Sequence, residues 1–249
     1  MQSRLILAFL MICAGSAAAL VDVGPAVGFD SRPPGEGDAV YGLSLAVHVG
    51  PASVYVRGAI MPTDSGDTSS DVYVDEWERR YYSADVTPLV AFSDKDVAPV
   101  VGLNYRQSRF KDYDYEGGER QKGFYTPLTY TDGETTSRRV LALGGVRFAN
   151  DEGLSGAAWG GVGVAFNEQG GVAWTETPPP ESKRTWSPLD AEWKTLELAA
   201  AAVATYRVAK YFGITGGFEI TNRITTLDDV APRERPVGFT LFFAPVLQF

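Results

Sequence analysis

Cysteine is almost absent from this chain of 249 residues, and histidine is equally scarce. The one cysteine, Cys13, lies in an N-terminal segment that we predict to be removed, which leaves no disulfide and no cysteine-based site. The one histidine, His48, has no second histidine or cysteine with which to form a metal motif. We therefore expect no metal site, no cofactor site and a fold that is stable without covalent cross-links.

Long apolar runs are missing after the N-terminus, and no basic face is visible. The apolar residues 5–13 are too few for a transmembrane helix, which needs about 20. They follow Arg4 and precede the small residues 17–19, which is the layout of a secretory signal peptide. We predict a signal peptide at 1–19 and one domain at 20–249. The net charge of −9 argues against a nucleic-acid partner.

The segment 237–249 alternates strictly between two kinds of side chain. Its odd positions are apolar apart from one proline, whereas its even positions are smaller or more mixed: the apolar ones are Phe239, Leu241, Phe243, Leu247 and Phe249. A period of two predicts a β-strand with one strongly apolar face. The same alternation occurs in 39–49, 97–108 and 212–223. If such strands meet lipid they must close into a barrel, because lipid cannot satisfy an open sheet edge.

This ending resembles the bacterial outer-membrane β-barrel proteins of the small class with eight to ten strands, whose last strand ends in phenylalanine after alternating apolar residues. The resemblance is to the class and points to no subfamily. It implies that the chain is exported and lies in the bacterial outer membrane after signal-peptide cleavage. It also implies three partners, namely membrane lipid, lipopolysaccharide and the barrel insertion machinery, which would recognise the alternating C-terminal residues as an insertion signal.

The fold class that we predict is all-β, a closed antiparallel up-and-down barrel with ten strands, and eight strands is the alternative. Nine strands are predicted from residue 39 onward, and the weaker segment 21–29 makes the number even, as single-chain bacterial barrels require. The strands are expected at 21–29, 39–49, 52–61, 83–92, 97–108, 138–148, 155–167, 194–208, 213–224 and 237–249. Segment 194–208 is rich in helix formers, so a helix is the alternative there. Short turns alternate with longer links, which is typical of outer-membrane barrels.

The strand register places charges of both signs inside the barrel. The predicted lumen charges are Arg57, Asp85, Arg106, Arg147, Glu197, Arg207, Glu219 and Arg223, with Asp22 and Arg139 on the same face. A barrel of about eight strands is just wide enough for side chains to fill. Ten strands leave two interpretations, an interior filled by ion pairs or a narrow passage.

The links at 62–82 and 168–193 carry most of the acidic excess. We expect a structural or surface-interaction role through these acidic external segments, with the external partner open. The tyrosine-rich segments 71–82 and 122–131 would extend strands above the membrane or form a contact surface. The alternatives are a narrow channel for ions or small solutes, and a soluble secreted β-barrel that binds a small ligand. No catalytic residue is expected, because His48 is predicted at the periplasmic end of its strand.

Overall fold

Eleven strands and no helix make up the described part of the chain. The computed structural model describes residues 19–31, 38–70, 73–93, 95–118, 129–150, 153–176, 184–226 and 237–249. Its strands are β1 (Ala19–Asp30), β2 (Asp38–Val49), β3 (Ala52–Ser70), β4 (Tyr73–Ala91), β5 (Val97–Gly118), β6 (Thr129–Ala149), β7 (Leu154–Glu176), β8 (Arg184–Pro188), β9 (Ala191–Ala209), β10 (Phe212–Thr226) and β11 (Val237–Gln248). The predicted signal peptide lies outside the described residues except for Ala19. Among those residues, no helix is long and apolar enough to cross a bilayer.

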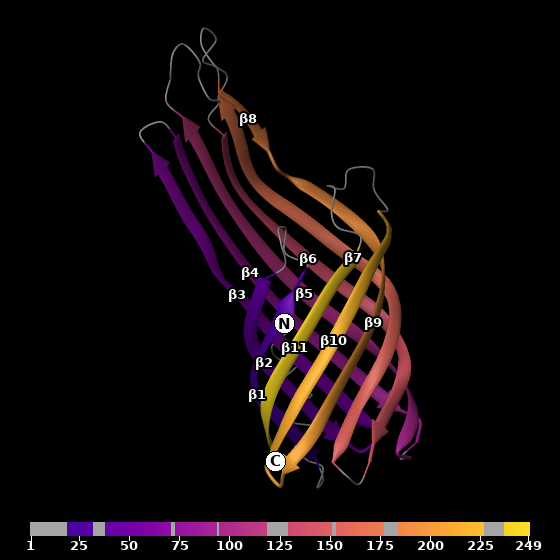
Figure 1. Cartoon of the computed structure of the whole chain (residues 1–249). Coiled ribbons are helices and arrows are strands. Elements are labelled where there is room, and N and C mark those ends of the chain that lie inside the picture. The colour runs from indigo at the N-terminus through magenta and orange to yellow at the C-terminus, as the bar shows by residue number, and fades with distance from the viewer. Residues whose placement is uncertain are drawn as a thin grey trace.

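Ten of the strands close into one antiparallel ring (Figure 1). Each strand pairs with its neighbours in sequence, and β1 pairs with β11 to complete the ring. The short strand β8 pairs with the upper part of β7, and β9 pairs with the lower part of the same β7 edge. The predicted all-β class and the count of ten barrel strands are confirmed, and the alternative of eight strands is wrong.

The apolar and smaller or polar residues that alternate in the sequence lie on the outer and inner faces of the barrel, respectively. Along β11 every second residue is buried and every other one is exposed, from Val237 to Gln248. Segment 194–208 lies within β9 and alternates in the same way, so the helix alternative is wrong there. Ala199 and Ala201 face the crowded inner wall, and pairing with β7 and β10 satisfies the backbone groups that a helix would have satisfied internally. Tertiary pairing thus overrides helix propensity in this segment.

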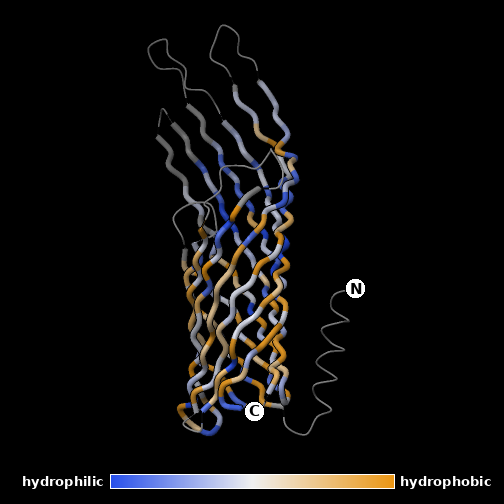
Figure 2. The backbone as a smooth tube through the Cα atoms, turned by 90° about the vertical axis from the view of Figure 1, so that its right-hand side faces the viewer, coloured by the Kyte–Doolittle hydropathy of each residue, from blue (hydrophilic) through white to orange (hydrophobic). Residues whose placement is uncertain are grey.

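Hydrophobic residues concentrate in the lower part of the barrel, where orange is frequent along the chain in Figure 2. Many large ones among them are exposed and form a band on the outer face. Leu43 is 64 % exposed and Phe243 is 54 % exposed. Water-soluble proteins rarely expose apolar surface that is continuous over such an area. The band is therefore the surface that a lipid bilayer would cover.

The wall of the barrel is much taller on one side than on the other (Figures 1 and 2). Strands β1, β2 and β11 have 12 residues each, whereas β5, β6 and β7 have 22, 21 and 23. Above the last pair of β2 with β3, at Tyr41 and Ile60, the upper parts of six strands continue as an open sheet. We call this the external half-sheet; it comprises 61–70, 73–81, 110–118, 129–135, 169–176 and 184–188.

The predicted links 62–82, 109–137 and 168–193 are therefore strand for much of their described length. The described parts of the tyrosine-rich segments, 73–82 in β4 and 129–131 in β6, do extend strands. Cross-strand pairs explain this difference, because opposite charges and aromatic rings face each other on neighbouring strands. Arg79 lies opposite Asp112, for example, and Tyr130 lies opposite Trp174.

Candidate functional site

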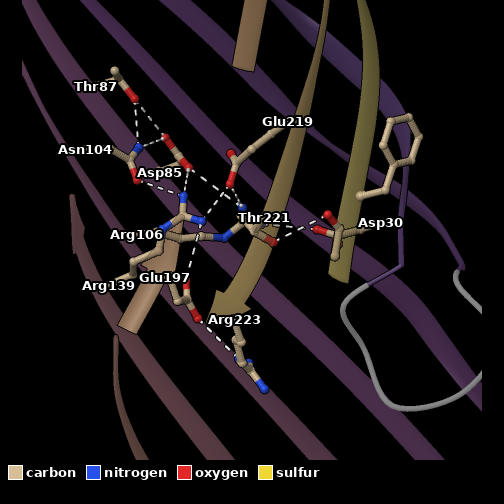
Figure 3. A network of polar contacts seen from close by, with 12 residues as sticks. Asp30, Asp85, Thr87, Asn104, Arg106, Arg139, Glu197, Glu219, Thr221 and Arg223 are labelled. Atoms are coloured by element: carbon tan, nitrogen blue, oxygen red, sulfur yellow. Dashed lines mark hydrogen bonds and ion pairs between the residues drawn. The ribbon is translucent and has the colours of Figure 1, made fainter. Parts of the chain in front are cut away.

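Eight charged side chains meet inside the barrel and form what we call the lumen network (Figure 3). They come from seven strands and comprise four arginines and four carboxylates: Arg57, Arg106, Arg139, Arg223, Asp30, Asp85, Glu197 and Glu219. The two charge signs therefore balance. Alternation places each of these side chains inward, and the closure of the ring brings distant strands face to face.

Arg106 and Arg139 are the centre of the lumen network, and each is 5 % exposed at the side chain. The Nη2 atom of Arg106 lies 3.1 Å from Oδ2 of Asp30, and its Nη1 atom lies 3.5 Å from Oε1 of Glu219. Arg139 Nη1 lies 2.7 Å from the same Glu219 oxygen and 3.9 Å from Oε2 of Glu197. One carboxylate thus joins two guanidinium groups that belong to different strands.

The outer members of the lumen network extend it across the barrel. Arg57 Nη2 lies 3.8 Å from Oδ2 of Asp85 and 3.6 Å from Oε2 of Glu219. Its guanidinium also lies 4.8 Å from the centre of the Phe242 ring, within cation–π range. Arg223 Nε lies 3.3 Å from Oε1 of Glu197.

Neutral side chains add hydrogen bonds to these charges. Asn104 donates to Asp85 and to Thr87, both at 2.9 Å, and accepts a bond from Arg139 at 2.8 Å. Arg106 also donates to the hydroxyl of Tyr81 at 3.3 Å. Buried charges are tolerated only when they are paired and hydrogen-bonded. The arrangement therefore holds its charges fixed.

The space around the lumen network is small. A cavity of about 40 Å³ lies beside it, lined among others by Tyr55, Trp159, Glu219 and Phe242. Such a volume holds only a few water molecules, since one needs about 10–15 Å³. Toward the end of the barrel with the short turns, an apolar cluster lies in the lumen and contains Leu89, Val100, Leu141 and Leu143, together with four alanines.

The predicted lumen charges fall into two groups. The structure brings Arg57, Asp85, Arg106, Glu197, Glu219 and Arg223 together in the lumen network. Arg147 and Arg207 lie elsewhere: Arg147 donates to the carbonyl of Gly50 at 3.0 Å, and Arg207 donates to Gln248 at 3.0 Å. Near the short turns, these two arginines connect parts of the ring that do not pair directly: β6 with the β2–β3 turn, and β9 with β11.

Sequence reasoning missed Asp30, Tyr81, Thr87 and Asn104. Asp30 lies one residue beyond the predicted strand 21–29, but it has the same inward parity as Asp22, which was a usable signal. Uncharged polar residues gave no such signal, because the sequence does not reveal which of them meet a charge.

His48 lies near the end of β2, beside Gly50 of the β2–β3 turn. Its Nδ1 atom is 2.9 Å from Oγ of Ser53, and its ring packs edge-on against Tyr55 at 5.6 Å between centroids. Asp22 lies deep in the same end of the lumen and is 1 % exposed. Among the described residues, no group of three or more His, Cys, Asp or Glu side chains is placed to hold a metal ion.

The outer face changes character above the apolar band. On β4 to β7 it first carries a strip of ion pairs, which we call the charged strip; its members are Glu78, Arg80, Arg109, Lys111, Asp132, Glu134, Arg138 and Glu168. Arg138 Nη1 lies 2.9 Å from Oε1 of Glu168, and Arg109 pairs with Glu134. This pairing raises the pKa of Arg109. These pairs are largely exposed, so each contributes little to stability.

Above the charged strip, aromatic rings form a row that crosses four strands. This aromatic row consists of Tyr113, Tyr130, Trp174 and Trp186, with successive ring centroids 5.7, 5.8 and 6.0 Å apart. Desolvation, together with carboxylates such as Glu76, raises the pKa of Tyr113. The row lies on the outward face, because Tyr130, Trp174 and Trp186 are paired in register and share the parity of Val140 and Val162.

Comparison with solved structures finds several bacterial outer-membrane barrels. The translocator domain of autotransporter NalP from Neisseria meningitidis aligns with a TM-score of 0.50 and 11 % identity, over 100 % of this chain and 95 % of that chain. The outer membrane protease OmpT from Escherichia coli aligns with a TM-score of 0.46 and 8 % identity, over 92 % and 94 %. Ail, the attachment invasion locus protein of Yersinia pestis, aligns at 0.32 and 12 %, over 93 % and 97 %.

No protein-family model and no curated protein sequence matches the chain. At these identities the structural likeness concerns the fold alone, and it rests on the NalP domain, which covers the whole length. It agrees with the ten-stranded ring, the outward apolar band and the polar lumen, which are the features that a barrel spanning lipid requires. The chain therefore has the fold of the bacterial outer-membrane β-barrels.

Proposed function

We propose that this protein is anchored in the bacterial outer membrane by its barrel and acts through the external half-sheet, without conducting solutes through the lumen. The observation that carries this proposal is the asymmetry of the wall. Six strand segments rise beyond the height at which β1, β2 and β11 end. A barrel that served only as a membrane anchor would not need this sheet.

The apolar band supports the anchoring. Its side chains include the predicted insertion signal, since Phe239, Leu241, Phe243, Leu247 and Phe249 all point outward and are 36 to 68 % exposed. Lipid and lipopolysaccharide are the surroundings in which such a band is stable, and the insertion machinery is the partner that would place it there. A soluble carrier protein would instead have polar side chains on this face.

The lumen network supports the absence of conduction. Four arginines and four carboxylates neutralise one another across the barrel, and the apolar cluster at Leu89 and Leu141 lies below them. An ion would have to displace hydrogen-bonded charges and then cross an apolar layer. These features favour a closed lumen over the channel hypothesis.

The external half-sheet supports an interaction role. Its outward face exposes tyrosine and tryptophan above a charged strip, and aromatic residues of this kind are enriched at interfaces. The proposal includes no catalytic step and no cofactor.

Two measurements test the proposal. Fractionation of the cells, with a heat-dependent shift of the folded protein on gels, should find the chain in the outer membrane. Purified protein in planar lipid bilayers should show no steady conductance. The chain in a soluble fraction would overturn the anchoring, and steady open-channel currents from the wild-type protein would overturn the closed lumen.

Exposure of the half-sheet is tested separately by protease treatment of intact cells. Cleavage within 62–82, 109–137 and 168–193, with the barrel strands protected, is the expected pattern. Protection of all three segments in intact cells, with cleavage only after lysis, would place the half-sheet on the wrong side of the membrane.

A further inference from the structure

The aromatic row has an outward position that lipid cannot reach. On β7, Trp174 and Phe166, the highest large apolar residue exposed on that strand, share one face and lie eight positions apart. At about 3.3 Å per residue and a strand tilt of about 40°, this places the row roughly 20 Å above the apolar band. An interfacial girdle lies next to the band, so the aromatic row has a different purpose.

The rings are exposed most at the end of the row. Trp186 is 58 % exposed and lies on β8, which pairs only with β7. Tyr130 and Trp174 stack with an angle of 15° between their ring planes, which fixes both rings in place. Among the described residues, the hydroxyls of Tyr113 and Tyr130 have no hydrogen-bond partner, so both can bond to a ligand.

A hollow of about 520 Å³ lies on the same outward face below the row. Gly170 leaves its floor open, and carboxylates line it at Glu134, Glu168, Asp190 and Glu192. Gly170 and Trp174 are four positions apart on the same face of β7, which corresponds to roughly 13 Å. The volume lies within the usual range for small-molecule sites, about 300 to 1,000 Å³.

We propose that the aromatic row and this hollow together bind the saccharide chain of the lipopolysaccharide that surrounds the protein. The inference rests on the proposed outer-membrane location. The row faces sideways and continues the lipid-facing wall upward, so it contacts whatever surrounds the protein at that height. In an outer membrane that material is the saccharide of neighbouring lipopolysaccharide molecules.

The chemistry of the site fits a chain of sugar rings. Aromatic faces pack against the apolar C–H faces of sugars, whereas tyrosine hydroxyls, indole N–H groups and carboxylates bond to sugar hydroxyls. Glu134, Glu168 and Glu78 are paired with arginines of the charged strip. Asp190 and Glu192 at the hollow, with Glu76 beside Tyr115 on the neighbouring strand, add negative charge that disfavours a strongly anionic ligand. The site therefore takes neutral sugar units rather than the phosphorylated part of the molecule.

The test measures binding of the saccharide that mild acid releases from the lipopolysaccharide of the bacterium that carries this gene. The full-length protein in detergent is titrated with this saccharide, and binding is followed by tryptophan fluorescence and calorimetry. Wild type should bind, and both Trp186→Ala and Trp174→Ala should weaken binding about tenfold or more, as expected for central aromatic contacts. Trp186→Ala removes little packing, so it remains informative if Trp174→Ala fails to fold.

Tyr211→Ala is the matched control, because Tyr211 is an exposed aromatic residue in the turn at the other end of the barrel. It should bind the saccharide as wild type does. Dextran and an oligolysine peptide serve as competing ligand classes. Equal binding of dextran, binding of oligolysine alone, or unchanged affinity of both tryptophan variants would overturn the proposal.

Failure of this inference is distinguishable from failure of the proposed function. Fractionation that finds the protein in a soluble compartment overturns the membrane location and this inference together. Correct fractionation and heat-dependent gel shift, with no saccharide binding to wild type, overturn the saccharide site alone.

Discussion

Arg139 Nη1 lies 2.7 Å from Oε1 of Glu219, and this contact joins β6 to β10 across the lumen. Both side chains are nearly buried, at 5 and 9 % exposure. The two strands are separated in the ring by β7 and β9, so the contact ties walls that no backbone hydrogen bond connects.

Replacement of Glu219 should destabilise the barrel strongly, because Glu219→Gln leaves three arginines with one carboxylate fewer. Removal of one partner from a buried ion pair costs about 3 kcal/mol or more. We expect a loss of that size in the free energy of unfolding, measured by denaturant titration of the folded protein in lipid vesicles.

Glu168→Gln provides the matched comparison, since the Arg138–Glu168 pair is about half exposed at both side chains. Glu168→Gln should lower the free energy of unfolding by less than about 1 kcal/mol. Equal decreases in the free energy of unfolding for Glu219→Gln and Glu168→Gln would show that the lumen network stabilises the barrel no more than an exposed ion pair does.

Arginine substitution tests the lipid-facing surface. Val101 points outward within the apolar band on β5 and is 45 % exposed. Val101→Arg should lower the free energy of unfolding by about 2–4 kcal/mol if the side chain lies near the bilayer midplane. Gln107→Arg changes an outward position of the same strand just above the band, and it should cost about 1 kcal/mol or less. Unfolding in vesicles measures both, and a similar cost for both would mean that lipid does not meet the band at Val101.

Gly163 is required by a close approach of two strands. A Cβ atom at this position would lie 1.9 Å from the carbonyl oxygen of Val140 and 2.7 Å from the Cα of Leu141. Gly163→Ala must therefore push β6 and β7 apart, at an expected cost of about 2 kcal/mol.

Gly160→Ala is the control for this prediction, because the nearest atom to its Cβ is the Ala199 oxygen at 3.8 Å. It should leave the unfolding midpoint nearly unchanged. If Gly160→Ala lowers the stability as much as Gly163→Ala does, replacement of any glycine in β7 is destabilising and the close approach at Gly163 is not the cause.

Substitution of Phe249 should affect recognition by the insertion machinery without affecting the stability of the folded barrel. Its side chain is 68 % exposed, while its backbone exchanges two hydrogen bonds with Val21, at 3.0 and 3.1 Å. Phe249→Ala keeps these bonds, so the barrel refolded in detergent should be nearly as stable as wild type. Assembly in cells should fall severalfold if the insertion machinery reads this ring.

The fraction of heat-shifted protein in membranes measures that assembly, and Tyr211→Ala controls for loss of an exposed aromatic residue at the same end. Equal assembly of Phe249→Ala and wild type would mean that the terminal ring is not a recognition element.

The sequence predicted the lower barrel well because lipid imposes a simple pattern there. In β11, Phe239, Leu241 and Phe243 alternate with residues that face the lumen, so strand, face and parity could all be read. In the external half-sheet both faces meet water, and neighbours such as Asp112 and Tyr113 give no contrast in hydrophobicity. Alternation alone therefore did not give the extra length of β5, β6 and β7, and the tyrosine-rich segments left strand extension and a contact surface as alternatives.

The sequence predicted which residues face the lumen better than it predicted which of them contact one another. Parity shows that Arg139 and Glu219 point inward, but whether they meet depends on how far each strand is staggered along the barrel axis. Between β6 and β10 that stagger follows from the registers of the pairs β6–β7, β7–β9 and β9–β10, which one sequence does not reveal.

The pairing of β1 with β11 governs how the chain folds. These strands come from opposite ends of the described chain. The sheet therefore keeps two open edges until the last strand has emerged from the ribosome. Before that point, apolar side chains and unpaired backbone groups are exposed together, which invites aggregation. Contacts this distant in sequence also form slowly. Holdase chaperones should therefore keep the chain unfolded until its membrane insertion.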